Sequence, residues 1–182
     1  MEYFNKVVNL QDYKLEYRQE LFEIILYSVV SFFLPFFVGH PQIVVGVLVN
    51  TFLITSALNV KGTKLLPVVI APSLGALSRG ILFGPFTIFL VYMIPFIWIG
   101  NSILVFAFKW LNLDKKLNKW VVLLIGAVTK AAFLFGIAYL LVSMKILPVP
   151  FLAAMGIFQF YTAILGGILA LGFQSAKKKF TV

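Results

Sequence analysis

Long apolar runs dominate the chain, and each predicts a helix of membrane-spanning length. The runs cover residues 21–38, 43–58, 65–83, 86–108, 120–142 and 151–173. A bilayer core about 30 Å thick needs about 20 helical residues that each rise about 1.5 Å. Strands of an outer-membrane barrel would alternate polar and apolar residues over about 10 positions, whereas these runs are apolar on all faces. The pattern therefore predicts an all-α integral membrane bundle of six transmembrane helices, in which the short second run tilts little or is partly re-entrant.

The segments outside these runs are polar. Residues 1–20 mix both charges with apolar side chains, which predicts either a helix lying at the membrane interface or a partly ordered tail. Residues 109–119 form the longest polar loop, and residues 174–182 form a basic tail. We therefore expect one membrane domain, residues 21–173, with a short polar segment at each end.

Composition supports the membrane assignment. Hydrophobic residues make up 62% of the chain, charged residues 12%, and mean hydropathy is +1.03. A soluble domain is about 45–50% apolar and about 25% charged, so an ordinary soluble enzyme and a disordered chain are both excluded. The formal net charge of +9 comes from basic residues that lie between apolar runs. We therefore expect the lipid bilayer, and not nucleic acid, as the partner of these charges.

The positions of the basic residues predict the orientation. With six spans, Arg79 and Lys130 fall inside runs and Lys145 alone lies on one side. The remaining twelve lie on the other side: Lys6, Lys14, Arg18, Lys61, Lys64, Lys109, Lys115, Lys116, Lys119, Lys177, Lys178 and Lys179. Cytoplasmic loops carry the excess of Lys and Arg. The prediction is a multi-pass plasma-membrane protein with both termini in the cytoplasm.

Most catalytic chemistry is absent from the composition. There is no cysteine, a single histidine, and no acidic residue after Glu23 except Asp114. No metal-ligand motif and no phosphate-binding glycine loop is present. We therefore expect no enzymatic activity, no cofactor and no resident metal.

Polar residues inside apolar helices are the candidates for function. A lysine or arginine in the membrane costs about 2.5–3.5 kcal/mol on insertion scales, so Lys130 and Arg79 are expected to face a cavity or to snorkel to the surface. Two such cations without a carboxylate suggest an anionic ligand. Asn50, Asn101 and Gln159 can join a binding site or hydrogen-bond between helices. His40 and Gln42 lie at the outer mouth. The small residues Ala163, Gly166, Gly167 and Ala170 predict close helix packing, within the bundle or against another subunit.

Four stretches carry a family resemblance. They are residues 40–50 (HPQIVVGVLVN), 71–74 (APSL), 93–101 (MIPFIWIGN) and 159–167. With six spans and cytoplasmic ends, the chain resembles the S components of energy-coupling-factor (ECF) transporters, or a small bacterial membrane family related to them. One departure is the first helix, where S components often show Ala-x-x-x-Ala and this chain has only Ser28 and Ser31.

The resemblance implies a subunit that captures a small-molecule substrate near the outer face and releases it inward. Its partners would be a transmembrane coupling subunit and ATPase subunits. On this hypothesis the ligand is a small polar or anionic nutrient, a vitamin or its precursor. The substrate-binding candidates are His40, Gln42, Asn50, Arg79, Asn101, Lys130 and Gln159. One alternative is a membrane scaffold that does not transport. A third hypothesis, ranked below both, is an oligomeric channel or secondary carrier.

Overall fold

The computed structural model describes residues 1–12, 15–38, 41–79 and 84–180, and this part of the chain is helical without a strand. In chain order the helices are α1 (Glu2–Val8), α2 (Tyr17–Phe37), α3 (Gln42–Asn59), α4 (Leu66–Arg79), α5 (Leu90–Ala107), α6 (Lys119–Ser143), α7 (Pro150–Met155) and α8 (Ile157–Phe180). Short 3₁₀ turns precede α4 (η1, Gly62–Leu65) and α5 (η2, Gly84–Phe89), and a π-helical segment extends α5 (η3, Phe108–Asp114). The predicted all-α class is confirmed.

Five helical segments are long and apolar enough to cross a membrane. They are Tyr17–Phe37, Gln42–Asn59, Phe86–Asp114, Lys119–Ser143 and Pro150–Lys177, and a shorter apolar segment covers Gly62–Ser78. These five indicate a multi-pass membrane protein. The short span is the third and not the second: α3 has 18 residues, whereas α4 has 14 and contains Pro72.

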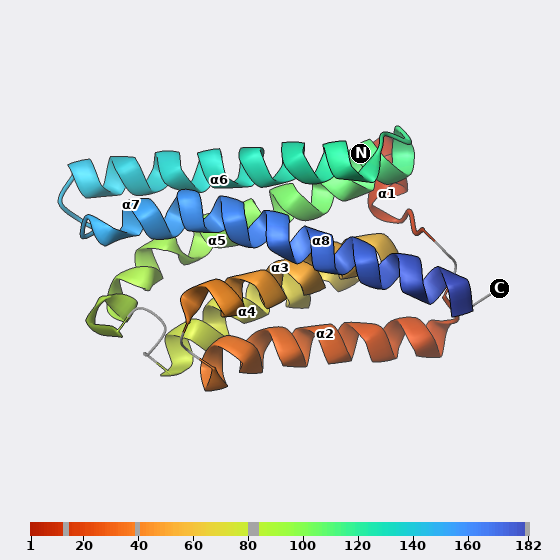
Figure 1. Ribbon diagram of the computed structural model, residues 1–182, viewed down its shortest axis with the longest axis horizontal. Coiled ribbons are helices and arrows are strands. Elements are labelled where there is room, and N and C mark those ends of the chain that lie inside the picture. Colours follow the sequence, from red (N-terminus) through yellow and green to blue (C-terminus); the bar gives the residue numbers. More distant parts are fainter. Residues whose placement is uncertain (13–14, 39–40, 80–83, 181–182) are drawn as a thin grey trace.

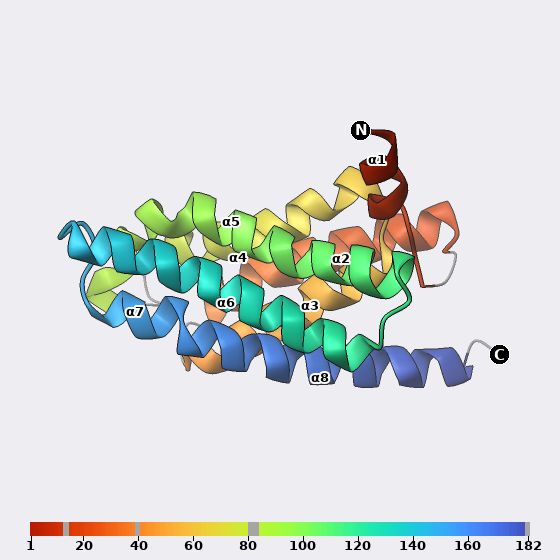
Figure 2. The ribbon, with the colours of Figure 1, turned by 90° about the horizontal axis from the view of Figure 1, so that it is seen from above.

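The long helices run side by side, and α1 and the C-terminal end of α8 lie at the same end of the bundle (Figures 1 and 2). The main pairs are α3 with α8, α2 with α4, and α5 with α6. Gly166 makes the first pair close, because a Cβ at this position would lie 2.5 Å from the Val47 carbonyl oxygen. Ala163 and Ala170, on the same stripe, are completely buried. The small-residue face of α8 therefore packs within the bundle.

Helices extend into the polar end segments and into the expected loop, and for residues 1–20 a helix is one of the two predicted alternatives. Helix α2 begins at Tyr17, α8 continues to Phe180, and the expected loop at 109–119 is helical as far as Asp114. Lys109 lies inside this helical extension with 1% of its surface exposed, so it is not the loop residue that we predicted. The first residues also form a helix, α1, in which Phe4 stacks on Phe106 of α5 with ring centroids 5.7 Å apart.

The end of the bundle that holds α1 and the C-terminal end of α8 contains a buried polar network, which we call the basic-end network. Glu20 on α2 accepts hydrogen bonds from Lys64 Nζ (2.7 Å) and from the Lys61 backbone N–H (2.8 Å). Glu23, also on α2, pairs with Lys177 of α8. Both carboxylates are buried, which corrects the expectation that the buried cations lie in a bundle without buried carboxylates. Sequence position alone hid this, because Glu20 and Glu23 stand at the edge of an apolar run.

Candidate functional site

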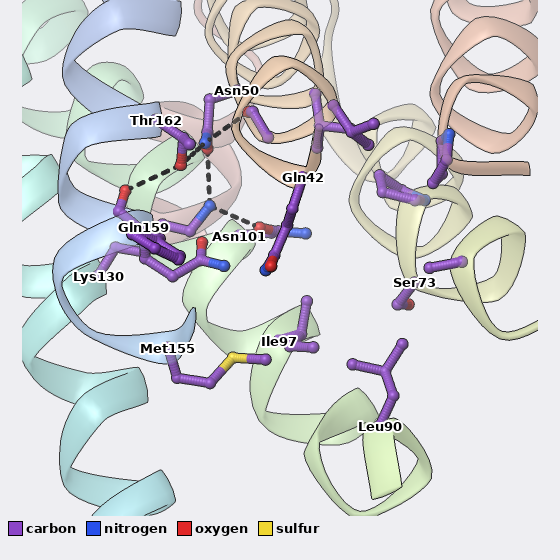
Figure 3. A pocket seen from close by; sticks show the side chains of 17 residues that line it. Gln42, Asn50, Ser73, Leu90, Ile97, Asn101, Lys130, Met155, Gln159 and Thr162 are labelled. Atoms are coloured by element: carbon purple, nitrogen blue, oxygen red, sulfur yellow. Dashed lines mark hydrogen bonds between the residues drawn. The ribbon is translucent and has the colours of Figure 1, made fainter. Parts of the chain in front are cut away.

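A cavity of about 90 Å³ is lined by the last turn of α2 and the first turns of α3 and α5, among other segments. These helix ends lie in the half of the bundle away from α1 (Figure 1). The cavity walls come from α2, α3, α4, α5, α6, α7 and α8, and they are mostly apolar (Figure 3). We call the polar side chains on this wall the Lys130 cluster: Lys130, Asn50, Asn101, Thr162, Gln42, Gln159 and Ser73. An apolar pocket with a few converging polar groups is the usual form of a small-molecule site.

Lys130 is the centre of the cluster. Its Nζ donates to Asn50 Oδ1 (2.7 Å) and to Asn101 Oδ1 (2.8 Å), so it joins α6 to α3 and to α5. The three side chains are each 2% exposed. Snorkelling to the surface, one of the two expectations for Lys130, is therefore wrong. An ammonium group has three donors, and these two contacts leave the third N–H without a protein acceptor in the described residues.

Hydrogen bonds to the backbone orient the two asparagines. Asn50 Nδ2 donates to the Gly46 carbonyl one turn earlier (2.9 Å) and to Thr162 Oγ1 (3.2 Å). Asn101 Nδ2 donates to the Val69 carbonyl of α4 (3.0 Å). Because each amide nitrogen faces a carbonyl, each amide oxygen is turned toward Lys130. The sequence thus builds a fixed pair of acceptors around the ammonium.

Two local features bring the helices to this geometry. Gly46 lets α3 approach α8, since a Cβ there would lie 2.8 Å from the Thr162 methyl carbon. On α4, Pro72 has no N–H for the helical hydrogen bond and lines the cavity next to Ser73. Ser73 in turn accepts from the indole nitrogen of Trp98 on α5 (2.7 Å). A glycine and a proline therefore shape the space that the polar residues border.

The electrostatics of the cluster are unbalanced. The hydrogen-bond partners of Lys130 are neutral amides, and no ion pair among the described residues includes it. The sequence has no acidic residue between Glu23 and Asp114 and none after Asp114. Neither of these acids lines the cavity. A buried cation is ordinarily paired with an anion. Lys130 has no such anionic partner among the described residues.

The structure brings together five of the seven residues expected from the sequence. Gln42, Asn50, Asn101, Lys130 and Gln159 all line the cavity. The other two expected residues are His40 and Arg79. His40 lies outside the described residues. Arg79 is the last residue of α4, and its side chain is not among the described ones.

Sequence reasoning missed Thr162 and Ser73 as members of the cluster. Thr162 stands three positions after Gln159, a spacing that puts both on one face of a helix, so this signal was present. Ser73 follows Pro72 inside an apolar run and gave no signal of its own. A metal is not favoured here, because no group of three His, Cys, Asp or Glu side chains gathers among the described residues.

Comparisons with known proteins add no relative: no family model matches the chain, and neither a curated protein nor a solved structure matches it.

Proposed function

We propose that the protein is a membrane-embedded binding subunit that captures a small molecule carrying an anionic group. The observation that carries the proposal is Lys130, a buried cation on a cavity wall whose only partners in the described chain are two neutral amides. A carboxylate or phosphate oxygen of the ligand would accept the remaining N–H and neutralise the charge. Hydrogen bonds that involve ions are about twice as strong as neutral ones, so this contact would dominate affinity.

The size of the cavity limits what enters it. An engineered cavity of about 150 Å³ holds benzene, so a space of about 90 Å³ suits a smaller group. The anionic end of a nutrient fits beside Lys130, while Gln42 and Gln159, both only partly buried, would contact the rest of the molecule. Uptake as an ECF-type S component extends this proposal, and it is supported by the resemblance of the sequence. ATP hydrolysis and coupling would then be carried out by partner subunits.

Native mass spectrometry tests the proposal on full-length protein extracted gently from its own membranes. We expect a bound small anion on the wild type, and its loss in Lys130→Met, which keeps an unbranched apolar stem and removes the charged ammonium group. Lys109→Met is the matched control, because Lys109 is equally buried but does not line the cavity, so it should keep the ligand.

Two results would oppose the proposal. One is a bare protein under conditions in which a known S component retains its ligand, and this outcome favours a scaffold whose polar residues only join helices. The other is a ligand retained in full by Lys130→Met. The extension to uptake has its own readout, since a coupling subunit and ATPases should co-purify with the protein. Their absence would remove the transporter assignment and leave the binding site in place.

A further inference from the structure

A second hollow lies near the basic end of the bundle, between α2 and α8, with α3 as its floor. Its volume is about 1200 Å³. Figure 1 shows α3 between α2 and α8, and both helices pack on α3. We call this space the α2–α8 groove. It is separate from the cavity of the Lys130 cluster, with which it shares no lining residue.

The walls of the groove are apolar and open. Phe22 on α2 and Phe173 on α8 are 66% and 62% exposed, and Leu26 and Leu169 add aliphatic surface. Gly172 leaves the α8 wall hollow, because a Cβ at that position would meet no atom within 4 Å. Such a surface suits a flexible hydrocarbon chain.

The length of the groove matches one leaflet. Along α8 its lining extends from Ile168 to Lys177, which at about 1.5 Å per residue is about 14 Å. Half of a hydrocarbon core about 30 Å thick is about 15 Å. A partner helix that crosses the membrane would need a contact surface of about twice this length. An acyl chain of a single leaflet has the length of the groove.

Charge is confined to one end of the groove. Arg18 is exposed there and has no hydrogen bond or ion pair within the described residues, and Lys177 pairs with Glu23. Glu23 is already engaged by Tyr27 Oη (3.0 Å) and Asn59 Nδ2 (3.1 Å). Among the residues that line the groove, two cations and one carboxylate leave one net positive charge. A phosphodiester carries one negative charge, so the charge of the groove is complementary to one anionic phospholipid.

We propose that the α2–α8 groove binds one anionic phospholipid, with an acyl chain against Phe22 and Phe173 and the phosphate at Arg18 and Lys177. The lipid would fill the space between two helices that do not close on each other. This site is independent of the ligand proposed for Lys130.

The test compares phosphatidylglycerol with phosphatidylcholine of the same acyl chains, each added to the purified full-length protein in a mild detergent. Native mass spectrometry reports the number of lipids retained. We expect one phosphatidylglycerol per chain to be retained in preference to phosphatidylcholine. Arg18→Gln should weaken this retention about fivefold, since a basic residue near an anionic membrane surface contributes about 1 kcal/mol.

A matched pair of glycine variants tests the location. Gly172→Leu should fill the groove and remove the bound phosphatidylglycerol, whereas Gly136→Leu should not. Both glycines have open space where a Cβ would stand and both lie on an exposed helix face, but only Gly172 lines the groove. If Gly172→Leu does not fold, Arg18→Gln at an exposed position still supplies the test.

Equal retention of the two lipids by the wild type would overturn the proposal, and so would retention that Gly172→Leu leaves unchanged. A stoichiometric partner protein that occupies the site without lipid, and that Gly172→Leu displaces, would overturn it as well. In that case the groove is a protein interface.

Discussion

Lys109 and Lys130 are almost equally withdrawn from the surface, at 1% and 2% exposure, but their surroundings differ. Lys109 lies in the basic-end network, where its Nζ donates to the carbonyl oxygens of Val60 (2.7 Å) and Leu10. The Val60 carbonyl and the Lys61 N–H belong to the same peptide unit. The carbonyl accepts a hydrogen bond from Lys109, and the N–H donates one to Glu20. A buried cation and a buried anion thus meet across a single peptide group.

Lys130 has no such compensation. Its partners are amide oxygens, a cavity adjoins it, and Glu20 and Glu23 stand at the other end of the bundle. Removing one partner of a compensated buried charge is destabilising, whereas a charge that the fold leaves unbalanced is available to a ligand. The comparison therefore separates a structural lysine from a functional one, and the following variants test it from the largest expected effect to the smallest.

Lys109→Met should lower the free energy of unfolding by about 2–4 kcal/mol. The reason is that the buried Val60 carbonyl and the partly buried Leu10 carbonyl lose their donor, and an unsatisfied buried group costs about 1–3 kcal/mol. Equilibrium unfolding in mixed micelles with increasing denaturing detergent measures this loss. Wild-type stability in this variant would show that Lys109 does not hold the network together.

Asparagine-to-aspartate changes should affect stability at the basic end and ligand binding at the Lys130 cluster. Asn59→Asp places a carboxylate against Glu23, to which Asn59 Nδ2 now donates, and should cost about 2 kcal/mol of stability. Asn50→Asp instead gives Lys130 an internal counter-ion in place of the ligand. We expect it to weaken binding of the anion identified by mass spectrometry about tenfold, because a charged hydrogen bond contributes about 1.5–3 kcal/mol.

Binding is measured as retention of that anion across a concentration series, and stability by the same detergent unfolding. If Asn50→Asp binds the anion as tightly as the wild type, the ligand does not meet Lys130. If Asn59→Asp is as stable as the wild type, the polar groups of the basic-end network do not have the structural role that distinguishes them from the Lys130 cluster.

Lys130→Met should change the stability of the ligand-free protein by no more than about 1 kcal/mol. Removing an uncompensated buried charge is favourable, and the amide oxygens of Asn50 and Asn101 that lose their donor adjoin a cavity that water can enter. The comparison with Lys109→Met, unfolded under identical conditions, is the control. A loss as large as that of Lys109→Met would mean that Lys130 is also a structural lysine.

Lys64→Met should have the smallest effect, below about 1 kcal/mol. Lys64 pairs with the buried Glu20, but its own side chain is 41% exposed, and exposed ion pairs contribute about 0–1 kcal/mol. Glu20 keeps the Lys61 N–H as a donor in this variant. Unfolding at low and at high salt measures the effect, and a loss of several kcal/mol at both would contradict it.

Sequence patterning predicted the helical class and the principal helices well, because an apolar run of membrane length has few other folds available. It also identified Lys130, Asn50 and Asn101, since polar residues in the middle of such runs are conspicuous. It misplaced Lys109 and overlooked the burial of Glu20 and Glu23, because these residues stand where a run meets a polar segment. At such a boundary, composition does not distinguish a solvated loop from a buried network.

The sequence alone determined which segments and chemical groups are present: apolar helices, a lysine within a span, and no acidic residue near that lysine along the chain. The tertiary structure decided which residues share the cavity and which buried lysine is compensated. Those outcomes depend on contacts between residues far apart in sequence, such as Lys130 with Asn50 and Lys109 with Val60. Such contacts follow from how helices rotate and pack against one another, as at Gly166 on Val47, and periodicity within one helix does not encode them.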